Sequence, residues 1–196
     1  MSSEHFPIFR YKYFKMSTLK VNNISPQTSW GTDGHPYTVP GMVLQVVNYP
    51  FDGTGTSAST TYVETGLSAT LTPVSASSKI LVQFHLFLTH NGDGQGAFTR
   101  LSRSIGGATA TYPILNTGGS EGQAYAFSIA SNGAEYNVTG ETISMSYLDS
   151  PSTTSAVEYN LEIRNLAATT KWNGTQDSNY STRNQISFIT LMEIAG

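Results

Sequence analysis

The chain has 196 residues and a formal net charge of −3; 38% of its residues are hydrophobic and 12% are Asp, Glu, Lys or Arg. This length suits one domain with an appendage, and the hydrophobic share is too high for a disordered chain. Cysteine is absent, which excludes disulfides and thiolate chemistry. No run of about 18 apolar residues occurs, so the sequence predicts no transmembrane helix and no membrane partner.

The charge is spread unevenly along the chain. The first twenty residues contain Arg10, Lys12, Lys15 and Lys20 against Glu4, which leaves a net charge near −6 for the rest. Proteins bind the phosphates of nucleic acids with clustered Lys and Arg side chains. The acidic remainder therefore argues against nucleic acid as the partner.

Residues 1–40 differ in character from the rest and are predicted to form an extended docking arm and its connector. The first fifteen residues alternate aromatic and basic side chains with the period of a strand. A single strand has no sheet of its own, so we expect it to pair with a sheet edge or lie in a groove of another protein. A disordered leader, or translation from Met16, is the alternative. The residues predicted to dock are Phe6, Phe9, Arg10, Tyr11, Tyr13 and Phe14.

Residues 41–196 contain a series of short strand patterns separated by turn signals. Two of the turns, Gly106-Gly107 and Asn132-Gly133, are dipeptides that favour tight hairpins. No capped, helix-period apolar run occurs. The predicted strands are Met42–Asn48, Thr60–Glu64, Ala69–Thr72, Lys79–Thr89, Ala97–Ser102, Thr109–Ile114, Gln123–Ala130, Glu135–Val138, Thr142–Leu148, Glu158–Leu166 and Gln185–Ile194.

This pattern predicts an all-β fold, an antiparallel β-sandwich or jelly-roll-like single domain over residues 41–196. In Lys79–Thr89 the even-numbered residues are apolar, and Leu81 and Phe87 add apolar side chains on the other face. The final strand is also apolar on both faces. Such a strand needs to be covered inside the sandwich or by another subunit, so we expect a symmetric homo-oligomer.

The sequence offers no set of residues that indicates catalysis, a metal or a cofactor. His85 and His90 are five positions apart, which places them on opposite faces of a strand and argues against a shared metal. The carboxylates show no clustering that would indicate a glycosidase pair, and no G-x-S-x-G nucleophile motif occurs. We therefore expect a protein that is not an enzyme, with no catalytic residue, no metal ligand and no cofactor.

Tyrosines near loops and strand ends are the candidate surface contacts. Tyrosine combined with Asn and Ser makes an adaptable surface of low charge, of the kind found in binding loops. Such a surface would suit a host glycan or protein, although tyrosines scattered through a sandwich explain the pattern equally well. The candidates for receptor contact are Tyr62, Tyr112, Tyr136 and Tyr180, with Tyr125 of the same kind.

From Met16 onward the sequence resembles virion proteins of marine and cyanobacterial tailed bacteriophages. The start MSTLKVNNI (16–24) is similar to a recurring opening of their tail-fibre and virion proteins. Four further segments resemble their C-terminal β domain. These segments are PGMVLQVV (40–47), TTYVETGLSATLTPVSASSKILV (60–82), LDSPSTTSAVEYNLEIRN (148–165) and ISFITLMEIAG (186–196). Residues 3–15 are not part of this resemblance. The resemblance implies a homotrimeric virion component with no catalytic residue to carry over.

Two placements in a phage particle follow as expectations. In the first, the chain is a short tail-fibre or attachment component whose arm docks to the tail or baseplate while the sandwich contacts the host. In the second, it is a capsid-decorating (cement) protein whose arm lies on the major capsid protein. A surface-glycan-degrading enzyme is the remote alternative. In either placement the protein would assemble in the host cytoplasm and leave by lysis.

Overall fold

A computed structural model describes residues 40–91, 96–114, 126–129, 140–166, 169–174 and 185–196, which belong to the compact unit Thr38–Gly196. The predicted docking arm, apart from Pro40, lies outside the described residues. So do the Asn132-Gly133 turn, the predicted strand Glu135–Val138 and half of Gln123–Ala130, whose other half is a strand, Ala126–Ile129. Predictions for these parts, including the boundary between arm and sandwich, stay predictions.

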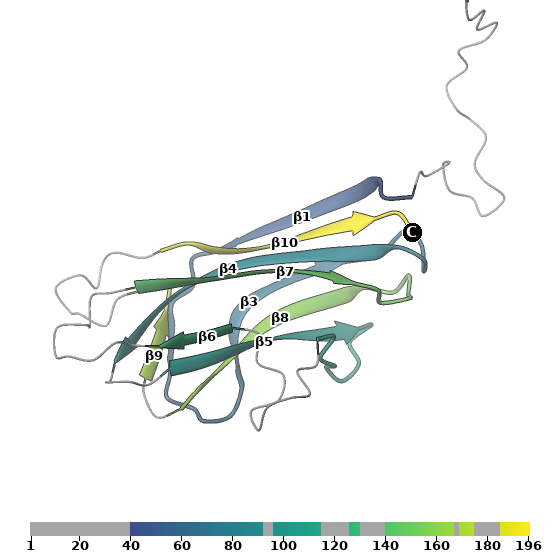
Figure 1. Ribbon diagram of the computed structural model, residues 1–196. Coiled ribbons are helices and arrows are strands. Elements are labelled where there is room, and N and C mark those ends of the chain that lie inside the picture. Colours follow the sequence, from purple (N-terminus) through teal and green to yellow (C-terminus); the bar gives the residue numbers. More distant parts are fainter. Residues whose placement is uncertain (1–39, 92–95, 115–125, 130–139, 167–168, 175–184) are drawn as a thin grey trace, which may run out of the picture. The chain divides into compact units, whose positions relative to one another are not determined.

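Two antiparallel sheets form the described part of the chain, which contains no helix. Figure 1 shows β1, β10, β4 and β7 of the first sheet running above β3, β8 and β5 of the second. The predicted all-β sandwich is therefore confirmed. The first sheet contains β1 (Val43–Phe51), β2 (Gly55–Ser57), β4 (Lys79–Asn91), β7 (Gly140–Asp149), β9 (Thr169–Trp172) and β10 (Ser187–Ile194). The second contains β3 (Val63–Leu71), β5 (Gly96–Ile105), β6 (Ala126–Ile129) and β8 (Val157–Asn165).

The long strand β4 organises the first sheet. Its first half pairs with β10, its last residues pair with β9, and its other side pairs with β7 from Ile80 to Thr89. β10 pairs in turn with β1, so β1, β10, β4 and β7 lie side by side. Because side chains alternate across a strand, every second residue of these four strands faces away from the second sheet.

The core fills the space between the sheets. Ile80, Val82, Phe84, Leu86 and Leu88 of β4 are buried, as the alternation in the sequence predicted. They face the second sheet, where β8 contributes buried Val157, Tyr159, Leu161 and Ile163. Burying each large apolar side chain stabilises the fold by roughly 1.5–3 kcal/mol. The two sheets are thus held together mainly by this apolar layer.

Two of the sequence predictions in this region are wrong. Thr60–Glu64 and Ala69–Thr72 are not separate strands, because both overlap the single strand β3 (Val63–Leu71). Gly66 lies inside β3 with a positive φ of 85°, where the pairing with β8 shifts register. A glycine at a bulge allows this backbone angle without ending the strand. Thr109–Ile114 does not form a strand either, because after the Gly106-Gly107 turn only Thr111 pairs back, with Arg103.

A polar cluster ties the two sheets together at one end of the core. Arg103 of β5 donates from Nη1 to both carboxylate oxygens of Asp149 at the end of β7, at 3.0 and 2.9 Å. The buried Tyr159 hydroxyl donates to Asp149 Oδ2 at 2.7 Å. Burial, followed by the hydrogen bond to Asp149, raises the pKa of Tyr159 well above its ordinary value. This cluster joins β5 and β8 of one sheet to β7 of the other.

Candidate functional site: the two outer faces

The outer face of the second sheet has an arginine held between two tyrosines. The guanidinium carbon of Arg100 lies 3.9 Å from the ring centres of both Tyr62 and Tyr112. Arg100 Nε also donates to Glu162 Oε2 at 2.5 Å, and its Nη2 donates to the Tyr112 hydroxyl at 2.6 Å. The Glu162 side chain is only 9% exposed, so this ion pair is largely shielded from water. Cation–π contacts of this kind gain strength when they are desolvated.

Two of the four predicted receptor-contact tyrosines therefore meet at one place, although fifty residues separate them in the sequence. Each presents a ring face to Arg100, and Arg164 adds a further contact with the Tyr62 ring at 5.6 Å. These faces are engaged within the protein itself. Tyr136 and Tyr180 lie outside the described residues. A role of these tyrosines in binding a host receptor stays a prediction.

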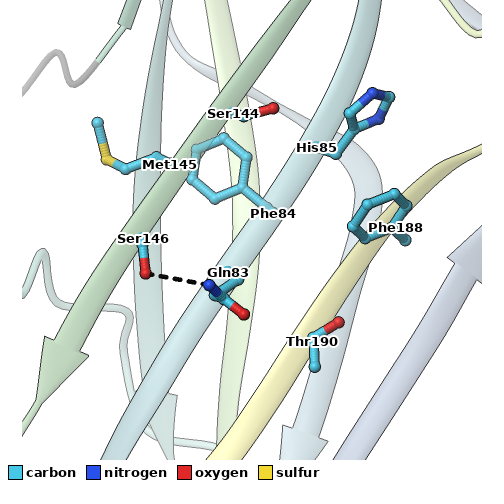
Figure 2. Close-up of a pocket in the computed structure, with 8 residues that line it drawn as sticks. All are labelled: Gln83, Phe84, His85, Ser144, Met145, Ser146, Phe188 and Thr190. Atoms are coloured by element: carbon cyan, nitrogen blue, oxygen red, sulfur yellow. Dashed lines mark hydrogen bonds between the residues drawn. The ribbon is translucent and has the colours of Figure 1, made fainter.

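The outer face of the first sheet is different, because it contains a shallow pocket without charged groups. The pocket has a volume of about 400 Å³ (Figure 2). Its lining combines amide, hydroxyl and imidazole groups with apolar surface and includes no Asp, Glu, Lys or Arg. The lining residues are Gln83, Phe84, His85, Ser144, Met145, Ser146, Phe188 and Thr190.

Strand pairing builds this pocket from β10, β4 and β7. Gln83 of β4 is paired with Thr190 of β10 on one side and with Ser146 of β7 on the other. Its side-chain amide lies 3.4 Å from Ser146 Oγ, the contact drawn in Figure 2. The small serines of β7 beside the larger side chains of β4 leave the surface hollowed. Its depth is set by side-chain size and not by a gap in the backbone.

An aromatic pair forms one side of the pocket. The rings of His85 and Phe188 stack with their centres 4.9 Å apart and their planes 5° from parallel. His85 Nδ1 is buried and finds no hydrogen-bond partner among the described residues. A buried polar atom without a partner carries a free-energy cost unless a partner supplies the hydrogen bond. The pocket therefore offers neutral hydrogen-bonding groups and an apolar wall to a bound partner.

The pocket has the groups for binding but lacks the arrangement for nucleophilic catalysis. Ser144 is paired in register with His85, yet an activated serine also needs a third group that orients the base. No carboxylate lines the pocket. Within the part of the chain that the structure describes, no three potential ligands are grouped as a metal site requires. No helix long and apolar enough to cross a membrane occurs among the described residues.

The second histidine of β4 lies on the opposite side of the strand and is enclosed by protein. His90 Nδ1 lies 2.8 Å from Thr170 Oγ1, and the side chain is buried. Desolvation by burial lowers the pKa of His90, while the carboxylate of Glu141 opposes that shift. His90 is thus a buried polar residue of the fold, and its side chain points to the face of β4 opposite the pocket.

The sequence contained only part of the signal for this surface. Apolar residues on both faces of the last strand indicated a covered outer face, and Phe188 belongs to that strand. The pocket itself depends on the register of β10, β4 and β7, which places Phe188 beside His85 across about one hundred residues of sequence. No short-range pattern encodes that pairing.

No protein-family model and no curated protein matches the sequence. Among solved structures, the chain is similar to two chains from infectious bursal disease virus particles. The first comes from virus-derived T=1 particles, with 13% identity over 83% of this chain and 41% of that chain and a TM-score of 0.40. The second comes from the T13 viral particle, with 12% identity over 88% of this chain and 39% of that chain and a TM-score of 0.43. The chain thus spans about two fifths of these longer chains, and TM-scores of this size do not establish a shared fold.

Proposed function

We propose that this chain is a structural protein of a tailed bacteriophage particle, acting as a short trimeric tail-fibre or attachment component. The proposal rests on the position of the segments that resemble phage virion proteins relative to the strands of the fold. These segments cover all of β3, β8 and β10 and the beginnings of β1 and β4. The resemblance to phage virion proteins therefore extends over the strands that build both layers of the sandwich, and not over one isolated loop.

The surface of the described residues supports a binding role over an enzymatic one. One outer face pairs Arg100 with Glu162 within the protein. The other offers an uncharged pocket without a carboxylate. A protein that acts by contact needs such surfaces, whereas a glycan-degrading enzyme needs two carboxylates placed across the sugar. In this proposal the chain has no catalytic residue.

The basic aromatic arm supplies the attachment to the particle in this proposal. Residues Phe9–Phe14 would add a strand to a sheet edge or occupy a groove of a tail, baseplate or capsid protein. Deleting residues 1–20 tests this, because the deletion leaves the ten strands that the structure describes in place. We expect the truncated protein to fold with the same β-type circular dichroism and to be absent from purified particles. Incorporation of the truncated protein at the normal level would contradict docking by the arm.

Competition for host cells tests the attachment role. Purified protein added before infection should reduce phage adsorption to its host in a dose-dependent way. The deletion of residues 1–20 should compete equally well, since the sandwich and not the arm would contact the host. No competition by either protein would contradict the tail-fibre assignment.

A cement protein is the second candidate, since one sandwich with a basic aromatic arm is enough to cap neighbouring capsid subunits. The two candidates differ in what a particle loses without the protein. Particles without a cement protein should release DNA at a lower temperature while adsorbing normally. Particles without an attachment component should keep their thermal stability and adsorb poorly.

A further inference from the structure

We propose that copies of this chain associate with each other through the outer face of β1, β10, β4 and β7, here called the neutral face. The neutral face consists of three rows of side chains that cross all four strands. The register of the strand pairs defines each row, so the rows follow from the backbone pairing and not from the sequence alone. The proposal rests on the proposed function in that it names a contact surface for the trimer, whereas the location of the protein on particles tests that function separately.

The first row is entirely apolar. Val46 of β1 pairs with Met192 of β10, Met192 pairs with Leu81 of β4, and Leu81 pairs with Leu148 of β7. Val46 and Leu148 at the two ends are 55% and 47% exposed, although they belong to regular strands. Scattered apolar residues on a surface are ordinary, but a continuous apolar row across a sheet indicates a contact surface.

The second and third rows add hydrogen-bonding and aromatic groups. In the second row Asn48 donates to Thr190 Oγ1 at 2.6 Å, followed by Gln83 and Ser146. In the third row Pro50 pairs with Phe188, Phe188 with His85, and His85 with Ser144. Phe188 is 41% exposed, and the pocket of Figure 2 lies between these two rows.

The distribution of charge favours a second copy as the partner. None of the residues in the three rows is Asp, Glu, Lys or Arg, and Lys79 lies one step beyond the apolar row, beside Ile194. The remainder of the chain after residue 20 carries a net charge near −6. Two copies of an acidic body repel each other where acidic groups meet. On the neutral face two identical copies can meet without placing like charges together.

The size of the neutral face suits a weak contact between copies. It is four strands wide, and its three rows extend from Phe188 to Met192 along β10. With strands ~4.8 Å apart and rows ~6.8 Å apart, it covers roughly 400 Å² per copy. Two copies would then bury about 800 Å², which lies in the range of weak, transient contacts. Association through this face alone should accordingly be weak.

Charged substitutions at the two exposed ends of the apolar row test the proposal. Val46→Glu and Leu148→Glu combined place two carboxylates where the copies would meet, at positions that the fold leaves exposed. The full-length protein should form dimers or trimers in sedimentation equilibrium at high protein concentration, and the double variant should associate at least about tenfold more weakly. The association of the unmodified protein should persist at high salt, because apolar contacts are not screened.

Leu166→Glu is the matched control, since Leu166 is 38% exposed and follows β8 on the other sheet. That variant should associate like the unmodified protein, and all variants should keep the same thermal unfolding midpoint in their monomeric form. Unmodified protein that stays monomeric would overturn the proposal, as would a double variant that associates normally. A monomer that instead binds a neutral oligosaccharide, and loses that binding in the double variant, would assign the face to glycan and also overturn self-association.

Discussion

The two outer faces of the sandwich use their polar side chains in opposite ways. On the second sheet, Arg100 is enclosed by Tyr62 and Tyr112 and paired with Glu162, so these groups are engaged within the protein. On the first sheet, the neutral face has no charge to satisfy and leaves Val46, Leu148 and Phe188 exposed. A closed face contributes to the stability of the protein that bears it, whereas an open face is available for contact with another molecule. Substitutions should therefore lower stability on the first kind of face and association on the second.

The largest effect on stability is expected where charge is buried between the sheets. Asp149→Ala leaves Arg103 and the Tyr159 hydroxyl without their shared acceptor, which should cost about 3–5 kcal/mol of unfolding free energy. Urea denaturation measures the change. The neighbouring Leu148→Ala, on the neutral face of the same strand, should cost less than about 1 kcal/mol in the monomer. Equal losses for the two variants would contradict the distinction between interior and outer face.

A smaller loss of stability is expected on the closed outer face. Arg100→Ala removes the partner of the nearly buried Glu162 and should lower the unfolding free energy by roughly 2–3 kcal/mol. Arg100→Lys keeps the charge but loses the planar stacking between two rings, so it should restore only part of the loss. Gln83→Ala, at the corresponding depth of the neutral face, should change it by no more than about 0.5 kcal/mol. Full recovery in Arg100→Lys would show that the planar stacking of the guanidinium on the tyrosine rings contributes nothing.

Removing a single buried hydrogen bond should lower the unfolding free energy by less than either of these changes. Tyr159→Phe removes the donor to Asp149 while keeping the buried ring, and should cost about 1 kcal/mol. Asp149 keeps Arg103 and the amide of Ser150 as partners, so no buried charge is left alone. Thermal or urea unfolding of the two proteins side by side gives the difference. A cost as large as that of Asp149→Ala would mean that Arg103 does not support the carboxylate.

The smallest effect concerns pH. Because burial lowers the pKa of His90 in the folded protein below 6.5, its value when unfolded, the unfolded chain takes up a proton more readily. The stability associated with neutral His90 is thus fully present above about pH 6.5 and is lost as the pH falls below it. His90→Gln should flatten the decrease in unfolding free energy between pH 7 and pH 5. An unchanged slope in that variant would show that other groups cause the acid sensitivity.

Sequence periodicity was sufficient to predict the long strands. It was insufficient to predict short strands, bulges and surfaces, which depend on how the strands pair. The alternation in Lys79–Thr89 and Glu158–Leu166 identified β4 and β8 and the faces that they bury. The short strands β2 and β9 were missed, because three or four residues carry too little period. Gly66 was taken as a strand boundary because a glycine that breaks a strand and one that forms a bulge look alike in sequence.

The candidate surfaces show the same limit. Tyr62 and Tyr112 were selected as separate surface residues, whereas the strand order β3-β8-β5 brings both onto Arg100. The neutral face is a set of rows across four strands. Each row joins residues that are far apart in the sequence, such as Val46 and Met192 in the first row, and no local pattern links them. The sequence did indicate that the last strand is apolar on both faces, so that each face must be covered by the sandwich or by another molecule.

The most direct test of the proposed function is the position of the protein on phage particles. Gold-labelled antibody against the purified sandwich, viewed by electron microscopy, should mark the tail or baseplate at a small, fixed number of sites. Labelling spread over the head would replace the tail-fibre assignment with the cement protein. Particles that carry no label, from cells in which the protein is made, would contradict the claim that this chain is a virion component.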